Sequence, residues 1–243
     1  QRQRPHEMQG LGVALVAAQQ LGAEHRVLEL GLVRDSIADL DADDFVRLDP
    51  KRLRPADLVP YRYDRVQPTP WLWMSEGLTD YYADLALVRS GLTDEAAFLN
   101  TTLGKIDHVA NVPAVALEDA SLQAWLGMSD GTGDIYYDKG SLAGFALDIL
   151  IRDASDGARS LDDVMRELWT GPTRAGRGFT PDEFWNAVTR AAGGRAFGQF
   201  DQRYVDGREA YPWNEWLPLA GWRIVEDSST EPRLGALLRA HES

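Results

Sequence analysis

Hydrophobic residues recur at helical spacing through most of the chain. The segment from Lys139 to Ile151 has the clearest pattern, because its apolar residues fall on a single stripe of a helix. Similar spacing predicts helices at Trp71 to Arg89, Thr93 to His108, Leu117 to Leu126, Leu161 to Trp169 and Thr180 to Ala192, and another ending near Val205. The sequence therefore predicts a mainly α fold.

Capping residues define two of these helices. Ser160 is a predicted N-cap because its hydroxyl can accept a hydrogen bond from the first turn, where acidic residues also suit the positive helix end. Thr180, followed by Pro181, repeats the arrangement. Gly193 and Gly194 are expected to end the second helix.

Three stretches depart from this helical pattern, and a fourth keeps it with an unusually acidic composition. Pro50, Pro55 and Pro60 predict an irregular, extended passage, and Trp213 to Val225 predicts turns and short strands. Met8 to Gln19 fits either a short buried helix or a strand. Asp35 to Asp49 has helical spacing with an acidic outer face. The expected β structure is small and lies mainly near the C-terminal end.

Composition limits the classes of partner. The chain has 243 residues, 44% hydrophobic and 26% charged, which is ordinary for a globular protein. A net charge of −13 argues against nucleic acid and anionic membranes, and no apolar run is long enough to span a bilayer. Because the chain starts at Gln1, we expect a fragment or processed piece. Its compartment, cytoplasmic or exported, and its oligomeric state are not indicated.

Metal chemistry is restricted by the residues available. The chain has no cysteine and only four histidines, so a transition metal would have to be held by imidazole and carboxylate groups. His6 to Gly10 begins like an HExxH motif, but its fifth position is glycine.

Glu76 is the first candidate for chemistry. It lies among apolar and aromatic residues in the segment Trp73 to Tyr82, and burying a lone carboxylate is costly unless it is paired or bound to metal. The alternative interpretation is an ordinary helix carboxylate in a salt bridge with a nearby arginine.

Tyr136 and Tyr137 form a second candidate. They follow a glycine-rich stretch and lead into the strongest predicted helix. A phenol at this point could donate a hydrogen bond to a developing oxyanion. The alternative is a pair of core aromatic residues with satisfied hydroxyl groups.

These two stretches, in this order, resemble the glycyl aminopeptidase family, the sixty-first metallopeptidase family. Glu76 to Tyr82 resembles its EGxTxYY segment and Tyr136 to Gly140 its YxKG segment, and similarity continues over residues 50 to 235. The resemblance implies the helical catalytic region of a thermolysin-like zinc peptidase, with short β elements near the C-terminal end.

The resemblance also assigns roles to residues. Glu76 matches a zinc ligand, and Tyr137, with Tyr136 beside it, matches the residue that stabilises the tetrahedral intermediate. Glu24, in a GxEH-like segment, matches a contact to the substrate's amino terminus. The positions of HExxHxWN fall on 42 to 49, where both histidines are absent and Asp43 is a shortened stand-in for the general base. Zinc is implied by the family, but Glu76 and a neighbouring aspartate would lack the three-ligand shell of catalytic zinc.

We accordingly expect three parts. Residues 1–50 form a divergent segment in place of the zinc motif, 51–235 a helical peptidase-like domain, and 236–243 the start of a missing PDZ-like domain. The implied activity is release of small amino-terminal residues, glycine or alanine, from peptides, in a form degenerate or incomplete here. Alternatives are a catalytically inactive relative that binds peptides or a partner, and an altered version of an active parent.

Overall fold

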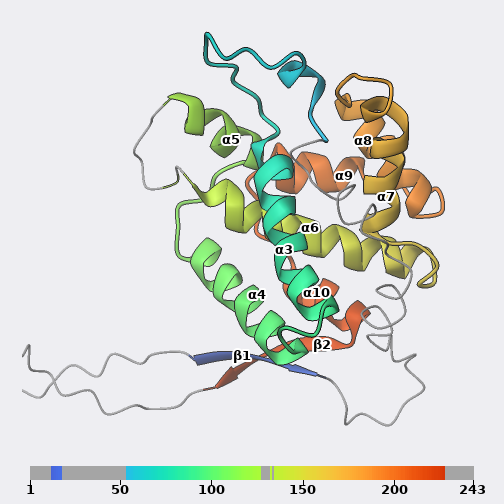
Figure 1. Cartoon of the computed structure of the whole chain (residues 1–243). Helices are drawn as coiled ribbons and strands as arrows, with labels where there is room; N and C mark the ends of the chain where they lie inside the picture. Colours follow the sequence, from blue (N-terminus) through green and yellow to red (C-terminus); the bar gives the residue numbers. More distant parts are fainter. Residues whose placement is uncertain (1–11, 18–52, 127–131, 133, 228–243) are drawn as a thin grey trace, which may run out of the picture.

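The computed structural model describes residues 12–17, 53–126, 132 and 134–227 (Figure 1). The fold is mainly α, as the sequence predicted. Its longer helices are α3 (Leu78–Arg89), α4 (Glu95–Ala110), α5 (Leu117–Leu126), α6 (Ile135–Ala154), α7 (Leu161–Leu168) and α8 (Pro181–Ala191).

Short helical segments connect or extend the long helices. They are η1 (Ala56–Leu58), the π-helical turns η2 (Trp73–Gly77), η3 (Trp169–Thr173) and η4 (Asp201–Val205), together with α9 (Gly198–Phe200), α10 (Trp213–Trp216) and η5 (Leu217–Ala220). None of the described helices is long and apolar enough to cross a bilayer.

The one sheet in the described residues has two strands. β1 (Gly12–Ala17) pairs antiparallel with β2 (Trp222–Asp227), with Gly12 opposite Asp227 and Ala17 opposite Trp222. β2 confirms the predicted strand near the C-terminal end, and β1 selects the strand alternative for Met8 to Gln19. Asp35 to Asp49 lies outside the described residues.

α6 is the central helix. Every residue from Lys139 to Arg152 is buried, because other helices pack around it on all sides (Figure 1). The sequence predicted a single buried stripe, so it underestimated how much of α6 is buried. Small residues at its remaining positions, such as Gly140 and Ala143, allow neighbours to approach closely.

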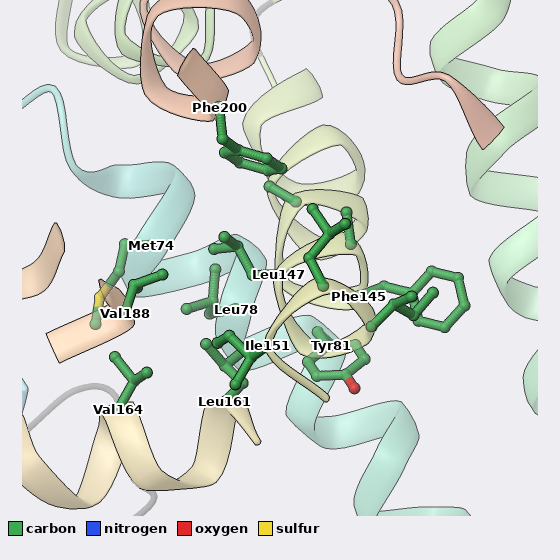
Figure 2. Close-up of a cluster of buried hydrophobic side chains, with 14 of the residues drawn as sticks. Met74, Leu78, Tyr81, Phe145, Leu147, Ile151, Leu161, Val164, Val188 and Phe200 are labelled. Atoms are coloured by element: carbon green, nitrogen blue, oxygen red, sulfur yellow. The ribbon is translucent and has the colours of Figure 1, made fainter. Parts of the chain in front are cut away.

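The main core lies between α6 and the helices beside it. Figure 2 shows Met74 and Leu78 converging with Leu147 and Ile151 of α6. The same cluster includes Leu161, Val164 and Val188 from α7 and α8. Each such buried aliphatic side chain contributes about 1.5–3 kcal/mol to folding.

The predicted caps are confirmed. Ser160 accepts a hydrogen bond from the α7 backbone, while Asp163 accepts one from the Ser160 N–H at 2.9 Å. Thr180 and Glu183 make the same reciprocal capping box at α8. These pairs satisfy backbone N–H groups that an α-helix leaves free.

One predicted helix start and one predicted type of structure were wrong. α6 begins at Ile135, not at Lys139, because nothing in the two tyrosines that follow breaks a helix, and the glycine-rich stretch ends earlier. The stretch from Trp213 was expected to form turns and strands, yet it begins with α10 and η5. Burial of Trp216 and Leu217 in the core stabilises these short helices.

Candidate functional site

Two glycines bring the backbones of η2 and α6 into direct contact. A Cβ atom added to Gly77 would lie 2.6 Å from the Gly140 Cα, and one added to Gly140 would lie 2.6 Å from the Trp73 carbonyl oxygen. Real Cβ atoms do not approach so closely, so any larger residue would force the segments apart. Gly77 is part of the EGxTxYY-like segment and Gly140 of the YxKG-like segment.

This contact sets Glu76 beside the tyrosine pair. Glu76 precedes Gly77 on η2 and is half-buried, while the tyrosines are on the first turn of α6. The rings of Tyr136 and Tyr137 lie 4.8 Å apart between centroids. The structure therefore brings together Glu76, Tyr136 and Tyr137, three of the five site residues that the resemblance had assigned.

The environment keeps the phenols protonated. Burial, followed by the negative charge of Glu76, raises the pKa of Tyr137 to about 12, and hydrogen bonds with Tyr136 and Glu76 add to the shift. Burial likewise raises the pKa of Tyr136. Both phenols therefore keep their O–H protons at neutral pH.

The salt-bridge interpretation of Glu76 is not seen in the described residues. There, no Arg or Lys lies within ion-pair distance of Glu76, whose neighbour is the Tyr137 phenol. Tyr137 is 39% exposed, whereas Tyr136 is half-buried and packs against the hydrophobic core. The arrangement presents a carboxylate and a phenol at a surface that a ligand can reach.

Lys139, one residue before Gly140, is the buried cation nearest this site in sequence. Its ammonium donates to the Val115 carbonyl oxygen at 2.5 Å, and in the described part of the chain it has no carboxylate partner. Burial, followed by repulsion from Arg208, lowers its pKa to about 8. The Tyr211 hydroxyl also donates to the Lys139 carbonyl, at 3.0 Å.

The described residues do not form a zinc site. A catalytic zinc ion needs three protein ligands, and within residues 53–126, 132 and 134–227 no three His, Cys, Asp or Glu side chains are grouped to hold a metal. His108 is engaged with Asp138 at 2.6 Å. Glu76, which the resemblance matches to a zinc ligand, has no histidine grouped with it among the described residues.

The remaining candidates cannot be placed. Asp43, Glu24, His6 and His25 all lie outside the described residues. Sequence reasoning missed the contact between the two motif glycines, although a glycine inside each motif was the available signal.

Comparison with known proteins gives two similarities. A model of the M61 glycyl aminopeptidase family matches residues 45–143, the range that holds Glu76 and both tyrosines. A solved structure of an aminopeptidase N family protein from Idiomarina loihiensis is 27% identical, with a TM-score of 0.62. That similarity covers 70% of this chain, which spans only 30% of the other protein's length. No curated protein matches the chain.

Proposed function

We propose, from the confirmed resemblance of this chain to the glycyl aminopeptidases, that its Glu76–Tyr137 site binds the amino-terminal end of a peptide. The observation that carries the proposal is the pairing of a carboxylate and a protonated phenol at a partly exposed surface. We further propose that these residues alone do not hydrolyse the bound peptide, because catalysis in this family depends on zinc and the zinc-binding histidines are absent at 42 to 49.

The chemistry of the site suits a peptide amino terminus. The α-ammonium group is a cation with three N–H donors, and the Glu76 carboxylate is an acceptor without a cation partner among the described residues. The faces of Tyr136 and Tyr137 add an electrostatic attraction for the same cation. When the ammonium takes the place of the Tyr137 hydroxyl at Glu76, that O–H can turn to donate to the first peptide carbonyl, which in a peptidase is the group that becomes the oxyanion.

Calorimetric titration tests the proposal directly. Triglycine amide should bind, and its N-acetylated form, which lacks the ammonium, should bind at least about tenfold more weakly. Glu76→Gln should weaken binding of triglycine amide by about tenfold or more, and Tyr137→Phe by several-fold. Glu215→Gln, at an exposed carboxylate on α10, is the matched control and should bind like the wild type. Equal binding of the two peptides would overturn the proposal.

Hydrolysis is the second candidate function. The protonated Tyr137 phenol beside Glu76 favours it, because such a donor can also stabilise the oxyanion that develops during hydrolysis. Its test is zinc content together with turnover of glycyl and alanyl amides by the metal-supplemented chain. Stoichiometric zinc with turnover would require histidine ligands from elsewhere, His6 or His25 first. We expect neither.

A further inference from the structure

We propose that a second site, at the opposite end of α6, binds a small carboxylate anion of two to four carbons. The site is a partly open cavity of about 50 Å³ lined by residues of α3, α4, α6, η5 and β2. Eleven residues separate Asp148, on its wall, from Tyr137, which is about 16 Å along an α-helix. The cavity is therefore separate from the Glu76–Tyr137 site.

One part of the cavity wall is polar and carries more donors than acceptors. Asp148 already accepts from the Tyr81 hydroxyl at 2.9 Å, from Arg152 Nε at 3.1 Å and from the Leu161 N–H at 2.7 Å. Its lone pairs are therefore largely occupied, and the acceptor that the wall lacks would have to come from a ligand.

The unused donors belong to two arginines. Arg89 donates to Asp162 through Nη2 at 2.8 Å, but its Nε is buried with no hydrogen-bond partner. Arg152 makes one side-chain hydrogen bond within the described residues, through Nε, which leaves its two Nη groups without a partner there. Both arginines are more than nine-tenths buried. Of these donors, Arg89 Nε is the one that is fully buried without an acceptor, which costs free energy that a ligand oxygen would recover.

The rest of the wall is apolar and selects the kind of anion. It consists of Leu85, Phe98, Phe145, Ile149, Ala220 and Trp222. A carboxylate has two oxygens at one end, which match the fork of a guanidinium, and carbon at the other. Phosphate or sulfate would turn further oxygens toward this apolar wall, where they would lose their hydration without compensation. The volume limits the hydrocarbon part to a few atoms.

Thermal unfolding of the whole chain with sodium propionate tests this site. At ten times its dissociation constant, propionate should raise the Tm by roughly 3–5 °C. Propionamide, a neutral molecule of the same shape, and sodium chloride at equal ionic strength should each leave the Tm within about 1 °C. Equal shifts with all three solutes would overturn the proposal, and so would no shift with propionate, because ordered water would then satisfy the arginines.

Two variants sharpen the test. Arg152→Lys keeps the positive charge but removes the fork, and it should weaken propionate binding about tenfold. Ala220→Leu adds bulk to the apolar wall without changing any charge and should abolish the propionate shift. Ala110→Leu is the matched control, because Ala110 is exposed at the end of α4 and outside the cavity wall. An unchanged propionate shift in Ala220→Leu would place the anion elsewhere and contradict the proposal, even if Arg152→Lys did not fold.

Discussion

Charged side chains near the two ends of α6 differ in whether they have partners of opposite charge. Near its start, Glu76 has no cation partner and Lys139 has no carboxylate partner within the described residues. Near its end, Asp148 binds Arg152, and Asp162 of α7 binds Arg89 of α3. Paired charges join helices in the second region, whereas the unpaired carboxylate of the first remains free to bind a ligand. The contrast separates a carboxylate without a cation partner from carboxylates that already bind arginines.

The backbones also meet differently at the two ends. At the start of α6 the contact with η2 is made by main-chain atoms at Gly77 and Gly140, so no side chain lies between them. At the end, side chains of α3 and α6 meet, as in the hydrogen bond between Tyr81 and Asp148. A substitution at the first contact must move a backbone, while one at the second changes mainly hydrogen bonds.

Gly140→Ala should have the largest effect on stability. Its methyl group would meet the Trp73 carbonyl oxygen at 2.6 Å, and we expect a loss of about 4 kcal/mol in the free energy of unfolding, measured by urea denaturation. Gly104→Ala on α4 is the matched control, since nothing lies within 4 Å of its new methyl group. That variant should gain about 0.5–1 kcal/mol from helix propensity. A similar small gain in Gly140→Ala would contradict the backbone contact.

Asp148→Asn should have the second-largest effect on stability. Removing this charge leaves Arg152 buried beside a neutral amide and weakens the hydrogen bond from Tyr81, so we expect a loss of about 3 kcal/mol in urea denaturation. Asp153→Asn, on the same helix, breaks only an exposed pair with Arg195 and should cost less than about 1 kcal/mol. If the two variants were equally stable, the buried network would not join the helices as described.

The lowered pKa of Lys139 predicts that the stability of the fold depends on pH. The unfolded chain holds this proton up to about pH 10.5, whereas the folded chain, with its pKa lowered to about 8, releases it earlier. Between these values the unfolded state binds more protons, so stability should rise with pH, by about 3 kcal/mol in total. Comparison of wild type with Lys139→Met at pH 7, 8, 9 and 10 isolates this contribution, which the variant should lack.

Lys105 is the matched control for that measurement, with the opposite sign. Its ammonium binds Asp80 and Asp84 at 2.5 and 2.6 Å, and although burial opposes the shift, these bonds raise its pKa. The stability it contributes is present below the unfolded pKa and is lost as pH rises through the folded one. Lys105→Met should therefore be less stable than wild type at pH 7. If the stabilities of the two lysine variants, relative to wild type, changed with pH in the same direction, Lys139 would have a carboxylate partner in the folded chain. That result would contradict the prediction.

Glu76→Gln should have the smallest effect on stability. The glutamine oxygen can still accept from the Tyr137 hydroxyl, and no cation partner in the described residues loses a charge, so we expect a change within about 0.5 kcal/mol. Urea denaturation beside Asp148→Asn makes the comparison direct. A loss above about 1.5 kcal/mol would reveal a cation bound to Glu76 and would end the contrast between the two regions.

Periodicity and capping residues predicted most of the helices because those signals are local. The helix from Leu117 to Leu126 has the predicted bounds, and Ser160 and Thr180 cap the helices that they were expected to cap. The helices that the sequence analysis did not predict, α10 and η5, are short and depend on tertiary packing of Trp216 and Leu217.

The candidate site was predicted in a different way. The proximity of Glu76 and Tyr137 came from the resemblance to a family, since no periodicity relates residues 61 positions apart. The charged network at the end of α6 was not predicted at all. Tyr81 and Asp148 are 67 positions apart, and Arg89 and Asp162 are 73, so their pairing depends on how helices pack and leaves no local pattern.

The glycine contact has a consequence for protein design. Because main-chain atoms fix the crossing of η2 and α6, the separation of carboxylate and phenol is a property of two short peptide segments, 73–80 and 136–144. A design that transfers the site to an unrelated helical scaffold would have to transfer both segments and keep their glycine contact. The amino-terminal recognition proposed for this chain could then be installed without the rest of the fold.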